Sequence, residues 1–300
     1  MTIIKVILVA CLALYFMLLP PPAFARTVSD QLGREVKIPE NPQRLVTLAA
    51  SLTEIVFALN QEHRLVGVEQ FSNYPAAAEN LPKVGSYISP DVERIVALRP
   101  DLCLAIKDGN PRHRVEWLES LGIPVYAVDP RNLEGVIATV YEIGHLLNAG
   151  DQAEALAKDL FQRRQHIISL VGRSVHRPRV FLQIGISPIV SAGSHTFLDE
   201  LITTAGGVNL TAGKVPYPRF SQEQVLALQP EVIIITSMTR GEIFERVKAF
   251  WHQWSTLPAA RDNRIYLVDS DIVDRPSPRI FAGLEALFGL LHPELAGGLQ

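Results

Sequence analysis

The stretch Asp151-Gln-Ala-Glu-Ala-Leu-Ala-Lys-Asp-Leu160-Phe-Gln-Arg-Arg-Gln-His-Ile-Ile-Ser-Leu170-Val-Gly-Arg173 lies near the middle of the chain and predicts one long helix. Its apolar residues recur three and four positions apart, which is the spacing of a single buried face. Asp151 and Glu154 predict a capping box at its start, and Gly172 with Pro178 predicts its end. About 22 residues at 1.5 Å each span about 33 Å, the width of a small domain. The helix suits either a strut between two lobes or an ordinary surface helix.

A repeated pattern on either side of this helix favours the strut. Glu93-Arg-Ile-Val-Ala-Leu-Arg-Pro100-Asp-Leu precedes it, and Glu223-Gln-Val-Leu-Ala-Leu-Gln-Pro230-Glu-Val follows it. Each copy predicts a short helix that begins with a glutamate and ends at a proline, followed by an apolar strand. The copies lie too far apart for a solenoid repeat. We therefore expect two similar lobes, residues 26–148 and 177–300, joined by a connecting helix within residues 149–176.

Runs rich in Val, Ile and Leu predict strands covered on both faces, as in parallel sheets between helices. These strands are Leu45–Ala49, Leu65–Glu69, Leu102–Ile106 and Val125–Asp129 in the first lobe, and Val180–Gly185, Val232–Thr236 and Ile265–Asp269 in the second. We expect a hairpin over Thr27–Pro39 and helices at Ser51–Leu59 (with a capping box from Ser51 to Glu54), Asn110–Leu121, Leu133–Leu147, Thr196–Ala205, Ser221–Leu228, Gly241–Phe250 and Pro278–Leu291. The predicted fold is α/β: two similar Rossmann-like lobes, one long rigid helix between them, and a ligand cleft between the lobes.

The first 25 residues have the pattern of a secretory signal peptide. Lys5 precedes an apolar run, and Ala23-Phe-Ala25 matches the small-residue cleavage site. Cleavage after Ala25 predicts a soluble, exported protein that begins at Arg26. Leu8-Val-Ala-Cys11 also resembles a lipoprotein cleavage box, but only a few apolar residues precede Cys11 and many follow it, which disfavours lipidation.

Composition and motifs exclude several classes of function. The chain carries 28 Lys and Arg against 31 Asp and Glu, so nothing favours nucleic-acid binding. It lacks a phosphate-binding loop and a Gly-x-Ser-x-Gly elbow, and its eight histidines form no metal-ligating motif. We therefore expect no catalytic residues, no metal site and no cofactor. Cys103, the only cysteine left after cleavage, lies in an apolar strand and is expected to be buried.

Ligands in such sheets bind at the loops that follow the carboxyl ends of the strands. Five aromatic residues lie on these predicted loops: Phe71, Tyr74, Tyr87, Tyr217 and Phe220. In a chain that is only 7% aromatic, the grouping favours aromatic walls for a ligand, although each ring alone is equally consistent with packing of its own loop. His195 is the one histidine on such a loop, and a surface or helix-capping position is favoured over ligand contact.

Two motifs carry a family resemblance: Val28-Ser-Asp-x-x-Gly33-Arg34 with Pro39 and Pro42-x-Arg44-Leu-Val, and Trp254-x-x-Leu257-Pro-Ala with Ile265-Tyr-Leu-Val-Asp269. With them the mature chain, along nearly its whole length, resembles the substrate-binding proteins of ABC importers for siderophores, haem and cobalamin. The resemblance implies a periplasmic, monomeric binding protein that is not an enzyme. It also implies an ABC permease–ATPase complex in the inner membrane as the partner.

A narrower resemblance is to the cobalamin-binding members, through Phe71-Ser-Asn-Tyr74-Pro75, Val215-Pro-Tyr-Pro218 and Asp271-x-x-Asp274-Arg275-x-Ser277-Pro-Arg279. It implies a corrinoid that is transported, not used as a cofactor. The residues implied to bind it are Phe71, Tyr74, Tyr87 and Tyr217, with Asp271 and Arg275 at the edge of the corrin. Glu93 and Glu223 are implied to meet the permease. Ile184 and Val190 depart from the pattern, because phenylalanines are expected there.

The sequence leaves other ligands and one other class of function open. An iron siderophore, being anionic, requires positive charge, which is available from Lys107, Arg112, Arg219, Arg275 and Arg279. Haem is a further alternative ligand. An enzyme acting on a tetrapyrrole or metal complex in the same cleft is the alternative class of function. In every case one rigid connecting helix should limit how far the lobes close.

Overall fold

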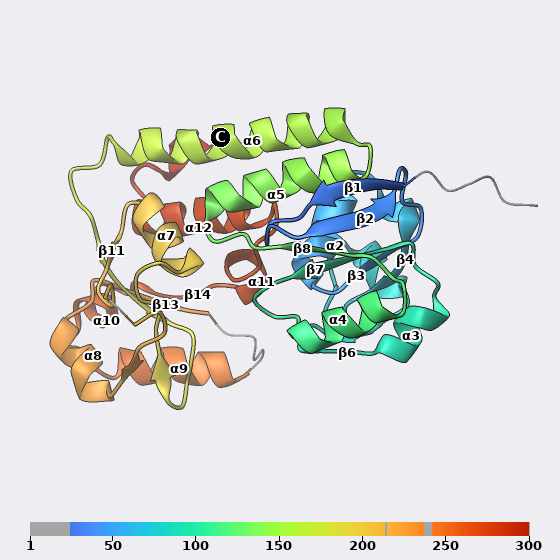
Figure 1. Cartoon of the computed structure of the whole chain (residues 1–300). Coiled ribbons are helices and arrows are strands. Elements are labelled where there is room, and N and C mark those ends of the chain that lie inside the picture. The colour runs from blue at the N-terminus through green and yellow to red at the C-terminus, as the bar shows by residue number, and fades with distance from the viewer. Residues whose placement is uncertain (1–24, 214, 237–241, 300) are drawn as a thin grey trace, which may run out of the picture.

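The computed structural model describes residues 25–213, 215–236 and 242–299. Two α/β lobes lie side by side beneath the long helix α6 (Gly150–Val171), which extends over both (Figure 1). We call the elements before α6 the N lobe and those after it the C lobe. The two-lobe fold predicted from the sequence is confirmed, whereas the lobe boundaries at residues 148 and 176 stay a prediction.

The N lobe is built on a four-stranded parallel sheet in the order β4-β3-β7-β8. The strands are β3 (Leu45–Thr47), β4 (Leu65–Val68), β7 (Leu102–Ile106) and β8 (Val125–Val128). The helices are α2 (Ala50–Ala58), α3 (Val92–Ala97), α4 (Arg112–Ser120) and α5 (Leu133–Leu146), with short 3-10 turns at Glu62–Arg64 and Ala76–Asn80. The predicted hairpin is present as β1 (Ala25–Ser29) against β2 (Glu35–Pro39), and a smaller one pairs β5 (Gly85–Ser86) with β6 (Ser89–Pro90).

The C lobe repeats this plan with a parallel sheet in the order β11-β9-β13-β14. The strands are β9 (Arg179–Gln183), β11 (Val208–Asn209), β13 (Val232–Ile235) and β14 (Ile265–Leu267), and a hairpin pairs β10 (Ile189–Val190) with β12 (Arg219–Phe220). The helices are α7 (Phe197–Thr204), α8 (Gln222–Leu228), α9 (Glu242–His252), α10 (Pro258–Arg261), α11 (Ser270–Val273) and α12 (Ile280–Leu291), followed by a 3-10 turn at Ala296–Leu299.

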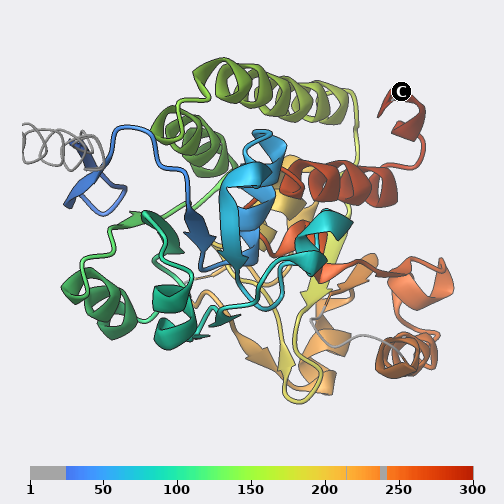
Figure 2. The ribbon, with the colours of Figure 1, turned by 90° about the vertical axis from the view of Figure 1, so that its right-hand side faces the viewer.

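Helix α6 packs on both lobes, against α5 of the N lobe and against α7 and α12 of the C lobe (Figure 2). Gly144 lets α5 approach closely, because a Cβ at that position would lie 2.2 Å from the Cβ of Ala153. Arg163 of α6 donates to both carboxylate oxygens of Glu285 on α12, at 2.7 and 2.8 Å. The expectation of a helix shared by both lobes is thus confirmed, and the surface-helix alternative is wrong.

Both predicted capping boxes are wrong. Helix α6 begins after Ala149, and helix α2 begins after Ala49; neither N-cap makes a side-chain hydrogen bond. The side chains of Asp151 and Glu154 are exposed, whereas Glu54 is buried and binds residues of the other lobe. A capping box is a local signal, and in α2 a distant tertiary partner outweighs it.

The predicted burial of Cys103 is confirmed, and the rest of the core joins the two lobes. Cys103 is fully buried in β7, and burial raises the pKa of its thiol well above the usual range. Trp251 is fully buried in the C lobe, where its indole Nε1 donates to Gln183 Oε1 at 2.7 Å. A continuous hydrophobic core runs from the N lobe through α5 and α6 into α7 and α12. The lobes are therefore joined by packed side chains as well as by the chain itself.

Residues 1–24 of the predicted signal peptide, which include Cys11, lie outside the described residues, as does the predicted start of a helix at Gly241. Across the described ranges, no helix combines the length and apolar character needed to cross a membrane.

Candidate functional site

The loops that follow the strands of the two sheets meet at the centre of the molecule. The loop after β4 contributes Phe71, Asn73 and Tyr74, and the segment after β14 contributes Asp271 and Arg275. Asn73 Nδ2 donates to Asp271 Oδ2 at 3.0 Å, and the Arg275 guanidinium donates to Asn73 Oδ1 at 2.7 Å. The interlobe face expected from the parallel sheets is thus built from residues of both lobes.

Glu54 of α2 forms the buried base of this face. Only 3% of the residue is exposed, and its carboxylate accepts from three C-lobe side chains. Arg275 binds Oε1 at 3.0 Å, Arg279 binds both oxygens at 2.8 and 3.0 Å, and the Ser277 hydroxyl binds Oε2. The two guanidiniums therefore share one carboxylate across the lobes. We call these four residues the Glu54 cluster.

Asp271 and Arg275, the predicted polar pair, do lie together. Their side chains form an ion pair at 2.8 Å, and Arg275 also donates to the Phe71 carbonyl at 3.3 Å. Arg275 is thus already engaged with N-lobe groups. Its contact with a ligand stays a prediction.

The predicted aromatic residues divide into exposed and packed side chains. Phe71, Tyr74 and Tyr217 are 51%, 46% and 60% exposed, which is unusual for rings of this size. Tyr87 is half-buried against Gly109, where a Cβ would lie 2.9 Å from its ring. Phe220, in contrast, packs edge-on against Phe181 at 5.7 Å and belongs to the C-lobe core.

Two aromatic residues sit close to charged groups. The Arg279 guanidinium lies over the Tyr74 ring, 3.9 Å from its centroid. Desolvation and the charges of Asp274 and Asp108 raise the pKa of the Tyr217 hydroxyl. The hydroxyl of Tyr217, a C-lobe residue, is therefore influenced by charges of both lobes.

Asp274 is a poorly solvated carboxyl in this region. Burial raises its pKa to about 7, and the charges of Asp271 and Asp269 act in the same direction. Near neutral pH the Asp274 carboxyl is therefore partly protonated. Nothing in the sequence distinguishes Asp274 from the other acids of its segment.

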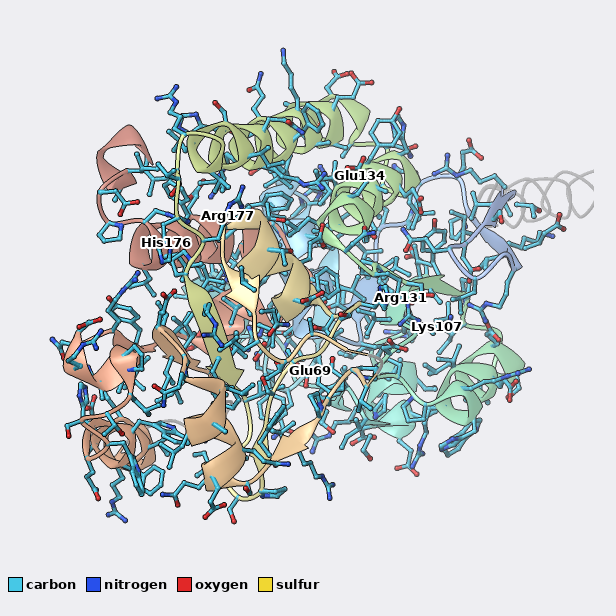
Figure 3. The ribbon with its side chains drawn as sticks, turned by 90° about the vertical axis from the view of Figure 1, so that its left-hand side faces the viewer. Glu69, Lys107, Arg131, Glu134, His176 and Arg177 are labelled. Atoms are coloured by element: carbon cyan, nitrogen blue, oxygen red, sulfur yellow. The ribbon has the colours of Figure 1, made fainter. Side chains whose placement is uncertain are left out.

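The positive charges at this end of the N lobe are largely neutralised by acids. Lys107 binds Asp129 at 2.8 Å, and Arg131 binds both Asp129 and Asp108; Figure 3 shows Lys107 and Arg131 next to each other. Arg112 binds Glu116 at 2.7 Å. Of the five cations considered for an anionic ligand, Lys107, Arg112, Arg275 and Arg279 thus carry a bound carboxylate, while Arg219 is exposed.

Ile184 and Val190, the departures from the expected phenylalanines, are half-buried, and the Ile184 amide donates to the Val190 carbonyl at 2.9 Å. His195 is exposed, has a left-handed backbone (φ 64°) and directly precedes Thr196, the N-cap of α7. This position agrees with the surface role favoured for His195. Among the described residues, no group of three His, Cys, Asp or Glu side chains could hold a metal ion.

Glu93 and Glu223 occupy equivalent positions in the two lobes, each in the first turn of a short helix, α3 or α8. Both side chains are exposed. A hydrogen bond from Ser221 and one from its own backbone lower the pKa of Glu223. Each lobe therefore presents one acidic side chain at a matched place.

Three residues with central positions were missed or misassigned from the sequence. Glu54 was assigned to a helix cap, Asn73 had no role, and Glu69 was expected only as a strand end. The signal for Glu54 is its place within the apolar helix Ala50–Ala58, where a carboxylate needs a buried partner. No such signal marks Asn73.

Comparison with known proteins agrees with this architecture. The family described as periplasmic binding protein matches residues 45–272. The vitamin B12-binding protein of Yersinia pestis (strain Pestoides F) is 33% identical over 248 residues, which cover 82% of this chain and 85% of that protein. The periplasmic vitamin B12 binding protein BtuF of Vibrio cholerae has a TM-score of 0.75 and 29% identity, covering 84% of this chain and 97% of that one. A periplasmic heme binding protein from Pseudomonas aeruginosa has a TM-score of 0.76 and 30% identity, covering 84% and 93%.

Proposed function

The chain belongs to the periplasmic binding protein family, and we propose that it captures a corrinoid for an ABC importer. The observation that carries the proposal is that exposed Phe71 and Tyr74 lie beside Arg275 and Arg279, cations that are already paired with acids, while Tyr217 adds an exposed ring from the C lobe. Such a surface suits a large ligand with apolar faces and a rim of neutral amides. The relatives described as vitamin B12-binding proteins point to the same ligand class.

The charge of the ligand distinguishes a corrinoid from an anionic siderophore at this site. A siderophore site needs guanidinium or ammonium donors that are free to pair with the ligand. Here Arg275 and Arg279 share Glu54, and Lys107 shares Asp129 with Arg131. An anion would have to compete with these carboxylates, so a neutral rim is the better match.

Haem is the second candidate ligand. It is favoured by the 30% identity to the Pseudomonas aeruginosa heme binding protein, and by the exposed tyrosines, because a tyrosine oxygen can ligate haem iron. Haem also carries two propionates, which meet the same objection as a siderophore.

Isothermal titration of the purified mature protein with cyanocobalamin, haem and a ferric siderophore tests the ligand assignment. We expect one cyanocobalamin per chain, no chemical change in it, and weaker or absent binding of the other two. Tyr87→Ala and Tyr217→Ala should each cost about 1–3 kcal/mol of binding free energy through lost stacking. Tyr141→Ala is the control, because Tyr141 is exposed on α5 and its ring packs against His145, which is not a proposed ligand residue. Tighter binding of haem or of the siderophore would overturn the corrinoid assignment.

The importer role rests on Glu93 and Glu223. Two exposed acids at matched places can meet arginines on a two-fold permease–ATPase complex in the inner membrane, one for each lobe. The double variant Glu93→Lys, Glu223→Lys should keep ligand affinity and lose permease association and stimulation of the ATPase. Glu154→Lys on the exposed face of α6 is the control. Full transport by the double variant would show that these acids serve only their own helices.

The periplasmic family implies a periplasmic protein, and we propose release there as a monomer after cleavage behind Ala25. Mass spectrometry of the exported protein should give an N-terminus at Arg26. A diacylglycerol on Cys11 would instead establish membrane anchoring.

A further inference from the structure

We propose that Glu69 is a positioning residue that fixes two aromatic walls of the binding site, Phe71 and Tyr87, relative to each other. The inference rests on the proposed function, because it assigns a part to a residue within the same site. Glu69 directly follows β4 and is only 1% exposed. In Figure 3 its label lies towards the middle of the molecule.

The Glu69 carboxylate accepts hydrogen bonds from two different loops. Glu69 Oε2 accepts the backbone N–H of Phe71 at 2.8 Å, and Oε1 accepts the backbone N–H of Tyr87 at 3.2 Å. Phe71 stands in the loop after β4, and Tyr87 stands in the turn between β5 and β6. Since each oxygen holds a different loop, displacement of the carboxylate releases both.

Other hydrogen bonds also join the loop after β4 to the turn between β5 and β6. The Gln70 amide donates to the Gly85 carbonyl at 2.8 Å, and just before it the Val84 amide donates to the Val68 carbonyl at 3.0 Å. Asn110 holds the other side of the Tyr87 peptide by donating to its carbonyl at 2.8 Å. Glu69 supplies the acceptors for the Phe71 and Tyr87 N–H groups, both in part-buried hydrogen bonds.

A carboxylate is the side chain that this arrangement requires. It offers acceptors on both oxygens, whereas the amide of glutamine offers one acceptor and turns two donors towards the second N–H. The charge is costly, because burial raises the pKa of Glu69. The two backbone N–H groups and the charges of Arg275 and Lys83 act in the opposite direction and stabilise the ionised form.

The lysine and arginine that face Glu69 are tied to the same loop. Lys83 Nζ donates to the Ser72 carbonyl at 2.7 Å, and Arg275 donates to the Phe71 carbonyl at 3.3 Å. The two cations whose charges act on Glu69 therefore also hold the loop that carries Phe71. Its removal should disturb the rings without breaking the Glu54 cluster.

The first experiment needs no ligand. Amide hydrogen exchange is followed residue by residue in the wild type and in Glu69→Gln. We expect both the Phe71 and Tyr87 amides to be protected in the wild type and at least one of them to exchange at least tenfold faster in the variant, because glutamine keeps an acceptor for only one of them. Unchanged exchange of both amides would overturn the inference whatever the protein binds.

The second experiment tests whether the two hydrogen bonds of Glu69 affect ligand affinity. Cyanocobalamin affinity of Glu69→Gln should fall about tenfold to a hundredfold, which is the usual effect of losing a hydrogen bond to a charged group. Asp101→Asn is the matched control, because Asp101 accepts the backbone N–H groups of Gln43 and Arg44, at 2.7 and 2.9 Å, near the opposite end of the same sheet. That variant should lose stability in urea and keep its affinity.

A mutant cycle distinguishes a positioning role of Glu69 from general destabilisation of the protein. In the background of Phe71→Ala with Tyr87→Ala, Glu69→Gln should weaken binding by less than about threefold, because the rings it positions are gone. An equal loss in both backgrounds would refute the positioning role.

If Glu69→Gln fails to fold, Glu69→Asp takes its place, because it keeps both acceptors but shortens the reach. If the wild type binds no corrinoid, the proposed function fails while the exchange result still decides this inference.

Discussion

Replacing Glu54 by alanine should lower the free energy of unfolding by about 3–5 kcal/mol, the usual cost of removing one partner from a buried ion pair. The substitution removes the one carboxylate that Arg275, Ser277 and Arg279 share. Arg275 keeps Asp271 at 2.8 Å and Asn73 at 2.7 Å, so its charge stays compensated. Arg279 keeps its stacking on Tyr74 but loses its carboxylate. We therefore expect a value near the lower end of the range, about 3 kcal/mol.

Urea denaturation of ligand-free protein, followed by circular dichroism, measures this loss. Glu54→Gln should cost less than Glu54→Ala, because an amide oxygen still accepts one donor. Glu285→Ala is the control: it removes the partner of Arg163 on α6, in a half-exposed pair whose expected contribution is about 1 kcal/mol or less. If Glu54→Ala costs no more than Glu285→Ala, the Glu54 cluster does not hold the lobes together and the reasoning from burial is wrong.

The remaining predictions concern charge and motion. Because the pKa of Asp274 is raised to about 7, the folded state holds this proton more tightly than the unfolded state. The free energy of unfolding should therefore fall as pH rises from about 4 to about 7, and Asp274→Asn should remove that part of the slope in urea titrations. Small-angle scattering should show little compaction on ligand binding, because α6 and the Glu54 cluster already join the lobes; a large compaction would contradict this. Arg275→Ala should weaken corrinoid binding, and affinity within error of the wild type would reduce Arg275 to a structural role.

Local patterns in the sequence predict much of the fold. Both ends of the strand Leu102–Ile106 are predicted correctly, because a proline and an acid precede its apolar run and charged residues follow it. The long helix is placed within two residues, since its apolar spacing and Gly172 are both local signals. The repeated Glu93 and Glu223 segments predict two similar lobes, which the two parallel sheets confirm.

The parts that could not be predicted depend on partners distant in the chain. Ser51 and Glu54 have the spacing of a capping box, but the partners of Glu54 lie more than 200 positions later. Glu69 marks the end of a strand in the sequence, and nothing there shows that its second oxygen meets the Tyr87 amide. A carboxylate within apolar residues indicates that a partner exists, but only the fold shows which one.

Arg275 shows how the resemblance and the structure fit together. The resemblance implies that it meets the ligand, and the structure places its guanidinium against Glu54, Asn73, Asp271 and the Phe71 carbonyl. These contacts fix the side chain before any ligand arrives. A preorganised arginine loses less conformational entropy on binding than a mobile one, and with its charge balanced it attracts anions less. We therefore propose that a fixed donor of this kind, beside exposed aromatic rings, meets a neutral amide of the ligand and not a carboxylate.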